Sequence, residues 1–333
     1  MKKTLVALAV LAASGASFAQ VTLTGNYTYG YRASTTGGAT ASDASGLGID
    51  TSALTFTAVE DLGAGMSAKA VMSIDGLNRA GVGGGDSSLS LGGGFGTITL
   101  GTGRGSDYLS GGVSGVGGVG MDDKVFSRLD SADSISYKSP TFSGFNVSIS
   151  HDENAIKRAD ESSGMDIGLG VGAAGTPASA AYQRGVNYSL SYAAGAIAAN
   201  AAYKTWDQQG DSTIDNVKNR VSIAGSYNFG VAKVGAGYRS SNYVTGTRQD
   251  TFLAVGVPMG ALTLGADYGV RKQDDRKFTA PDTVNGSRSG YGFKAEYALS
   301  KRTSVIGSYA SWETSVNVAN RSTETNLLLS HSF

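Results

Sequence analysis

The sequence predicts an all-β protein, a closed 16-stranded antiparallel transmembrane β-barrel. Three observations lead to this fold class. Apolar and polar side chains alternate with a period of two, and short and long connections follow one another in turn. No stretch after residue 19 is apolar for the roughly 18 residues that a membrane helix needs. A closed barrel crosses a bilayer without such a helix, because no backbone edge is left unpaired in hydrocarbon.

The composition excludes several classes of protein. The chain has 333 residues with 49 glycines, 16 tyrosines and no cysteine, and its lysines and arginines equal its acidic residues in number. A balanced charge argues against nucleic acid as a partner, since such proteins carry a basic patch or stripe. The absence of cysteine excludes disulfides and thiolate metal sites.

Residues 1–19 are expected to be a secretory signal peptide. Lys2 and Lys3 are followed by a short apolar run, and Ser17-Phe18-Ala19 is a small-x-small cleavage site before Gln20. The apolar run is too short for a membrane anchor. We therefore expect cleavage after Ala19 and a mature barrel domain at 20–333.

The first strand is expected directly after this site. Val21, Leu23, Tyr27, Tyr29 and Tyr31 share one parity, and threonine, asparagine and arginine share the other. Such alternation gives a strand one apolar and one polar face. The pattern returns in fifteen further stretches, at residues 54–58, 68–74, 89–91, 98–100, 135–137, 145–149, 186–192, 197–203, 221–227, 234–238, 253–257, 262–270, 291–299, 305–309 and 327–333.

The connections indicate which faces meet lipid and water. The short ones are EDLGAG, GGGF, SPTFSG, AAGA, NFG, VPMGA and LSKRT, and the long ones lie between them. A soluble sandwich would not separate its short and long connections so consistently. We therefore expect the apolar face, with tyrosines near strand ends, to point toward lipid and the polar face to line a water-filled lumen.

One connection is unusually long and rich in glycine. It runs from about Gly101 to Asp133 between two predicted strands, and no helix or strand period is visible in it. Connections of this length in compact domains are usually functional. We expect this loop, at about 104–133, to fold into the barrel and narrow it.

Several stretches together resemble general porins of Gram-negative bacteria, of the beta-proteobacterial type. They are EDLG at 60–63, GGGFGTITLG at 92–101, SISYKSPTFSGF at 134–145, YNFGVAKVGAGY at 227–238, EYALSKRT at 296–303 and LSHSF at 329–333. The resemblance covers the mature chain. It implies an outer-membrane homotrimer with one pore per barrel, surrounded by lipid and lipopolysaccharide and passing ions and small hydrophilic solutes. It also implies that the third long loop folds inward and that the insertion machinery reads Phe333.

Motifs for catalysis or cofactor binding are weak. Residues 115–120 spell G-x-G-x-x-G, but no strand-to-helix context surrounds them. His151 and His331 belong to no recognisable catalytic set, and Asp122-Asp123 lacks the ligand ladder of a cation site. We expect no enzyme activity, cofactor or metal.

Charges in the lumen are the candidate functional residues. On the acidic loop side we expect Asp107, Asp122, Asp123 and Asp130, and on the basic side Arg32, Lys69, Arg104, Arg220, Lys233 and Arg271. Lys204, Arg239 and Lys294 also share the inward parity, whereas inward acids look fewer, chiefly Asp267 and Glu296. Acid facing base across a narrow pore would set ion preference. Alternatively, each charge is merely solvated in a wide lumen.

The chain departs from the porin pattern at four positions. Related porins often carry arginine or lysine where this chain has Ala53, Thr57, Thr102 and Ser136. The loss of these basic side chains predicts weak ion selectivity or a preference for cations. A substrate-specific channel on the same fold is the main rival function, and a barrel-anchored enzyme or adhesin is a more distant one.

Overall fold

The computed structural model is built from β-strands. It describes residues 20–37, 42–78, 81–104, 109–127, 131–154, 182–209, 217–243, 246–274, 285–315 and 320–333. Within these ranges no helix is long and apolar enough to span a membrane. The strands are β1 (Gln20–Thr36), β2 (Ser42–Gly63), β3 (Met66–Asn78), β4 (Gly81–Gly93), β5 (Gly96–Arg104), β6 (Ser131–Lys138), β7 (Phe145–Asn154), β8 (Tyr182–Ala194), β9 (Ile197–Gln209), β10 (Val217–Asn228), β11 (Lys233–Tyr243), β12 (Gly246–Met259), β13 (Leu262–Asp274), β14 (Gly286–Ala298), β15 (Thr303–Glu313) and β16 (Arg321–Ser332).

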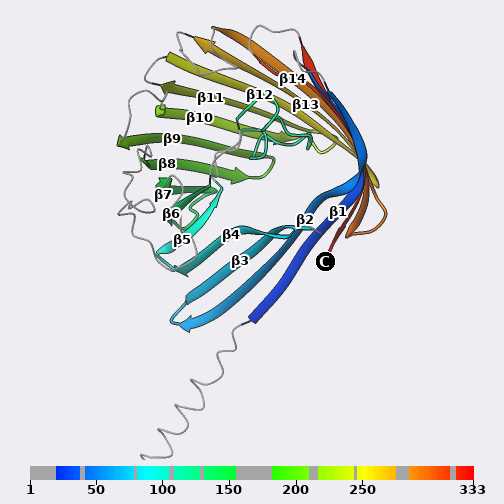
Figure 1. Cartoon of the computed structure of the whole chain (residues 1–333). Coiled ribbons are helices and arrows are strands. Elements are labelled where there is room, and N and C mark those ends of the chain that lie inside the picture. Colours follow the sequence, from blue (N-terminus) through cyan, green and yellow to red (C-terminus); the bar gives the residue numbers. More distant parts are fainter. Residues whose placement is uncertain are drawn as a thin grey trace, which may run out of the picture.

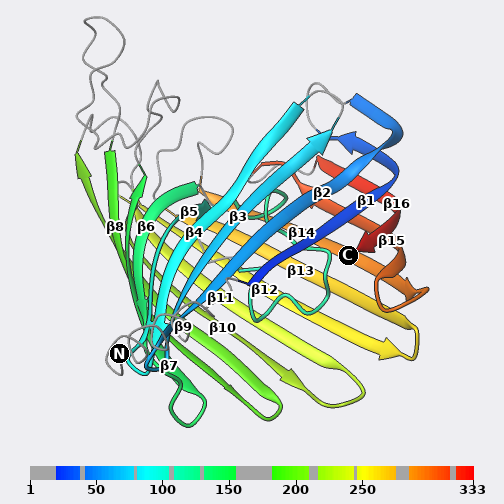
Figure 2. The same cartoon turned by 90° about the horizontal axis from the view of Figure 1, so that it is seen from below.

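The sixteen strands form one closed antiparallel barrel. Each strand pairs with its neighbours in the sequence, and β1 pairs with β16 to close the ring (Figures 1 and 2). This confirms the predicted fold class. Neighbouring strands in the sequence can pair throughout because each is joined to the next by a hairpin, so no crossover is needed.

Side-chain parity divides the wall as expected. Outward apolar residues are exposed on every part of the wall, for example Leu23 at 51%, Ile223 at 56% and Leu327 at 60% of their surface. In a soluble protein this would be an exposed apolar belt, but it suits a surface that faces lipid. The inward parity carries Asn26, Thr28 and other polar residues that hydrogen-bond one another across β1 and β16.

The C-terminal residue closes the barrel. Phe333 exchanges two backbone hydrogen bonds with Gly25, each of 3.0 Å. The phenyl ring lies over Gly25 on the outer face, where a Cβ atom would come within 2.4 Å of the ring. Phe333 therefore takes part in the seam between β16 and β1, and glycine at position 25 leaves room for its ring.

Candidate functional site

The described part of the loop between β5 and β6, residues 109–127, lies inside the barrel against the inner face of β11 to β15 (Figure 2). Four of its apolar side chains, Leu109, Met121, Val125 and Phe126, are buried and pack with Phe252 of β12. Ala254 completes this cluster, and Trp312 of β15 packs against it. Because strands β11 to β15 face β3 to β7 across the closed ring, the loop occupies one side of the lumen.

Glycines on both surfaces allow the loop to approach the wall. A Cβ atom added to Gly265 of β13 would lie 1.9 Å from the Gly117 carbonyl oxygen, and one on Gly235 of β11 would lie 2.0 Å from that of Ser114. A Cβ atom added to Gly256 of β12 or to Gly292 of β14 would lie 2.4 Å from the nearest atom of the loop. The glycine-rich loop was expected from the sequence, whereas the glycines of the wall that face it were not. The available signal was glycine at inward parity on several consecutive strands.

A methyl group on this wall is therefore expected to displace the loop. Gly265→Ala places a Cβ atom against the loop backbone. A change of side-chain rotamer cannot relieve this clash, so the loop as a whole must shift. We expect a larger single-channel conductance in planar bilayers. Gly307→Ala on β15 is the matched control, since a Cβ atom there meets nothing within 4 Å. Equal conductance of the two variants would contradict this account of loop packing.

Asp267 of β13 ties the tip of the loop to the wall. Its Oδ2 atom accepts hydrogen bonds from the Val119 and Gly120 backbone amides, at 2.8 and 2.7 Å. Hydrogen bonds to a carboxylate are stronger than those between neutral groups. Asp267, which the sequence predicts to be an inward-facing acid, is 3% exposed and serves as an anchor of the loop.

A second network holds the loop in its own shape. The Ser110 hydroxyl donates to an Oδ2 atom of Asp122 and accepts from the Met121 and Asp122 backbone amides, at 2.9 and 3.0 Å. The other carboxylate oxygen of Asp122 is buried without a hydrogen-bond partner in the described structure. This burial raises the pKa of Asp122 above its ordinary value of 3.8, because the charged form is poorly solvated.

The raised pKa predicts that acid favours the packed loop. The packed loop favours protonated Asp122. The resulting stabilisation of the packed state is fully present below pH 3.8 and is lost as the pH rises through the raised pKa. We expect hydrogen exchange at the loop amides, corrected for intrinsic rates, to speed up across this interval. Asp122→Asn should flatten that dependence, whereas Asp123→Asn at the exposed neighbouring position should keep it. An unchanged profile in Asp122→Asn would contradict the assignment.

A buried ion cluster lies beneath the C-terminal part of the loop. Asp250 of β12 accepts hydrogen bonds from Arg239 of β11 and Arg271 of β13, with closest distances of 2.7 Å to each. All three side chains are at most 3% exposed. Both guanidinium groups lie about 6 Å from the centre of the Phe126 ring, the range of a cation–π contact. Arg271 therefore lies between the wall and the loop and contacts the loop directly, instead of facing it across the pore.

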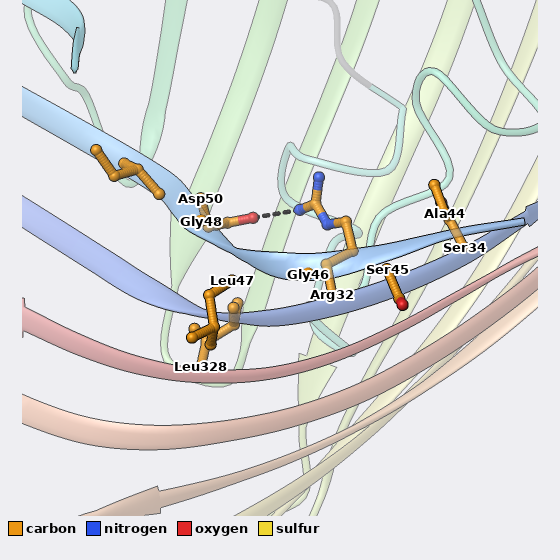
Figure 3. A pocket seen from close by; sticks show the side chains of 11 residues that line it. Arg32, Ser34, Ala44, Ser45, Gly46, Leu47, Gly48, Asp50 and Leu328 are labelled. Atoms are coloured by element: carbon orange, nitrogen blue, oxygen red, sulfur yellow. Dashed lines mark hydrogen bonds and ion pairs between the residues drawn. The ribbon is translucent and has the colours of Figure 1, made fainter. Parts of the chain in front are cut away.

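Arg32 of β1 points into the lumen but is balanced by acids. It pairs with Asp50 of β2 (Figure 3), and its Nε atom lies 3.7 Å from a Glu324 carboxylate oxygen. The other oxygen of Glu324 is 3.7 Å from Lys124 of the loop. A β-bulge between Thr28 and Tyr29 makes Asp50 an extra residue in β2, which turns its side chain toward Arg32.

The other predicted wall residues lie apart from one another. Lys69 is exposed on β3, and Lys233 is exposed at the start of β11. Arg220 of β10 donates to the Ser241 hydroxyl and stacks on Trp206. The predictions for Asp107 and Asp130 and for the side chain of Arg104 fall outside the described residues.

The expectation of few inward acids was wrong. Four acids besides Asp267 and Glu296 pair with inward bases: Asp50 with Arg32, Asp152 with Lys204, Asp250 with Arg271, and Glu324 with both Arg32 and Lys124. Asp250 and Glu324 could have been found by extending the inward parity of the predicted strands at 253–257 and 327–333 toward lower residue numbers. Asp50 could not, because the bulge shifts its parity.

The four departures from the porin pattern do not share one face. Ala53, Thr57 and Ser136 have the inward parity of their strands. Thr102 has the parity of Leu100, whose side chain is 53% exposed on the outer face. Only three of these uncharged positions therefore bear on the lumen.

A closed 16-stranded barrel with an apolar exterior, a charged interior and a loop packed inside it is a membrane channel. A family model described as Gram-negative porin matches residues 4–317, and the chain belongs to this family. No curated protein sequence matches the chain.

Solved structures share the fold at low sequence identity. An anion-selective porin from Comamonas acidovorans has 20% identity and a TM-score of 0.70, with 95% of this chain and 100% of that one covered. A loop L8 deletion mutant of the outer membrane protein OmpT of Vibrio cholerae has 12% identity and a TM-score of 0.63, with 95% and 99% covered. A substituted porin from Rhodopseudomonas blastica has 16% identity and a TM-score of 0.60, with 94% and 100% covered.

Proposed function

We propose that the chain is an outer-membrane porin that passes ions and small hydrophilic solutes down their gradients, with the loop at about 104–133 as its constriction. The observation that carries this proposal is the packing of residues 109–127 on the inner wall of a closed barrel. A barrel of sixteen strands leaves an aqueous channel, and a loop on its inner wall narrows that channel. The family and the fold indicate a channel, not an enzyme.

Electrostatics favour weak selectivity with a preference for cations. Arg32, Lys204, Arg271 and Lys294 each pair with a carboxylate, so their fields are largely cancelled. Asp122 and Asp123 lie on the acidic side of the constriction, Asp123 at an exposed position of the loop. Three inward positions that carry bases in related porins are uncharged here. The proposed selectivity thus differs from that named for the Comamonas acidovorans porin.

Reversal potentials test both the channel and its selectivity. The mature protein is reconstituted in planar bilayers with KCl at different concentrations on the two sides. We expect stepwise conductance and a small reversal potential of the sign for cation preference. A potential near the chloride limit would overturn the selectivity, and the absence of steps would overturn the channel.

The resemblance supports three further proposals. The chain would be exported with cleavage after Ala19, would use Phe333 as a signal for insertion, and would assemble as a homotrimer in the lipid and lipopolysaccharide of the bacterial outer membrane. Residues 1–19 lie outside the described part of the structure. Gel electrophoresis with and without heating, together with N-terminal sequencing, tests assembly and cleavage. A monomer band in both unheated and heated samples would argue against the trimer.

A further inference from the structure

Both tryptophans of the chain face the lumen. The sequence has two, Trp206 and Trp312. Trp206 shares the parity of Lys204 on β9, opposite to that of the outward Tyr203, and Trp312 shares the parity of the buried Ala310 on β15. Tryptophan in membrane barrels is normally placed at the lipid interface, because the ring is largely apolar and its N–H is polar. Two indoles on the wet side therefore call for a reason.

The inserted loop explains only one of them. Trp312 packs against the buried cluster of Met121, Val125 and Phe126, and Lys124 of the loop lies 5.6 Å from its ring centre. Trp206 does not belong to that cluster. It stands on β9, two strands from the nearest strand that the loop covers, and is only half-buried. Part of its ring is thus open to the lumen.

Two basic side chains lie close to the ring of Trp206. The Lys204 Nζ atom and the Arg220 Cζ atom each lie 5.0 Å from the ring centre. Lys204 pairs with Asp152, which largely cancels its charge, and Arg220 donates a hydrogen bond to the Ser241 hydroxyl, so both side chains are held in place. Trp206 pairs in register with Gly185 of β8, whose missing side chain lets the indole and the Lys204 stem lie flat on the wall.

Strand register connects this cluster to Ser127, near the C-terminal end of the loop. Arg220 pairs with Ser241, and Ser241 pairs with Arg248, whose guanidinium contacts Ser127 of the loop. A solute that follows this wall toward the loop end therefore passes the Trp206 ring beside the Arg220 guanidinium. A planar ring stacks on indole, and a carboxylate accepts hydrogen bonds from guanidinium and ammonium groups.

We propose that Trp206, Lys204 and Arg220 form a lumen binding site for anionic aromatic solutes, the arene carboxylates. This inference rests on the proposed channel function and names a solute class that the channel would retain during passage. The indole supplies the stacking surface, and the Arg220 guanidinium supplies recognition of the carboxylate, while Lys204, paired with Asp152, holds the ring in place. Neutral arenes would keep only the stacking, and aliphatic carboxylates only the charge.

Fluorescence of one tryptophan tests the site directly. Trp312→Phe leaves Trp206 as the sole indole, and 4-nitrobenzoate serves as an anionic aromatic quencher. We expect saturable quenching, with binding about tenfold weaker for neutral 4-nitrobenzyl alcohol or in Arg220→Gln, as loss of a charge-assisted contact of about 1.4 kcal/mol implies. Quenching that stays linear with concentration, or that is equal for both probes, would overturn the site.

Bilayer recordings separate failure of the site from failure of the channel. We expect 4-nitrobenzoate to reduce KCl current saturably in the parent protein and in Trp206→Phe, which keeps a ring, but not in Trp206→Leu. Equal block in Trp206→Leu would overturn the site, while KCl conductance in all three proteins would leave the channel proposal standing. If the parent forms no KCl channel, the proposed function itself fails.

Discussion

Phe126→Ala is expected to release the constriction loop from the barrel wall. Phe126 is 1% exposed, meets Phe252 edge to face with ring centres 6.3 Å apart, and covers both guanidinium groups of the buried cluster. Removing a buried phenyl ring costs about 3–5 kcal/mol. Because 1.4 kcal/mol corresponds to a factor of ten, the equilibrium constant that favours the packed loop over released forms should fall by more than about a hundredfold.

The released loop should alter both conductance and exchange. We expect a higher or noisier single-channel conductance and faster hydrogen exchange at residues 109–127. Phe142→Ala is the control, because that ring is 81% exposed at the turn between β6 and β7. Deleting residues 111–120, which takes away the segment over β11 to β14, should enlarge the pore further. If the deletion and Phe126→Ala both conduct like the parent, the loop is not the constriction.

Removing the two acids beside Arg32 is expected to shift selectivity toward anions. Asp50→Asn with Glu324→Gln leaves the Arg32 guanidinium, 48% exposed in the lumen, without its two carboxylate partners. A unit charge about 4 Å away contributes about 1 kcal/mol in water, which is roughly a fivefold change in the ratio of anion to cation permeability. Reversal potentials in a KCl gradient measure this ratio, and high salt should reduce the shift.

A matched loss of charge outside the pore isolates the effect. Glu60→Gln with Asp61→Asn also removes two carboxylates, but at the exposed end of β2, next to the turn that leads to β3. This control should leave the permeability ratio close to that of the parent. A similar shift in both double variants would mean that net charge, and not the neutralisation of Arg32, sets selectivity.

Most of the fold was predictable because alternation is local. Each strand of a membrane barrel must show lipid one face and water the other, so Val21 to Tyr31 and the fifteen later stretches record their own orientation. The closed sheet has only neighbour pairing, so the order of strands followed from the hairpins. The inward loop was predictable in its place, between β5 and β6, from its length and its glycines.

The partners of the lumen charges were not predictable in the same way. The sequence alone indicated which face of each predicted strand points inward and that the loop at about 104–133 would fold into the barrel, since parity and loop length are properties of short segments. Only the tertiary structure decided that Asp267 anchors the loop, that Arg271 lies between the wall and the loop, and that Arg32 is neutralised by Asp50 and Glu324. The physical reason is that such pairs depend on register between strands and on a bulge at Asp50, which side-chain alternation within one strand does not encode.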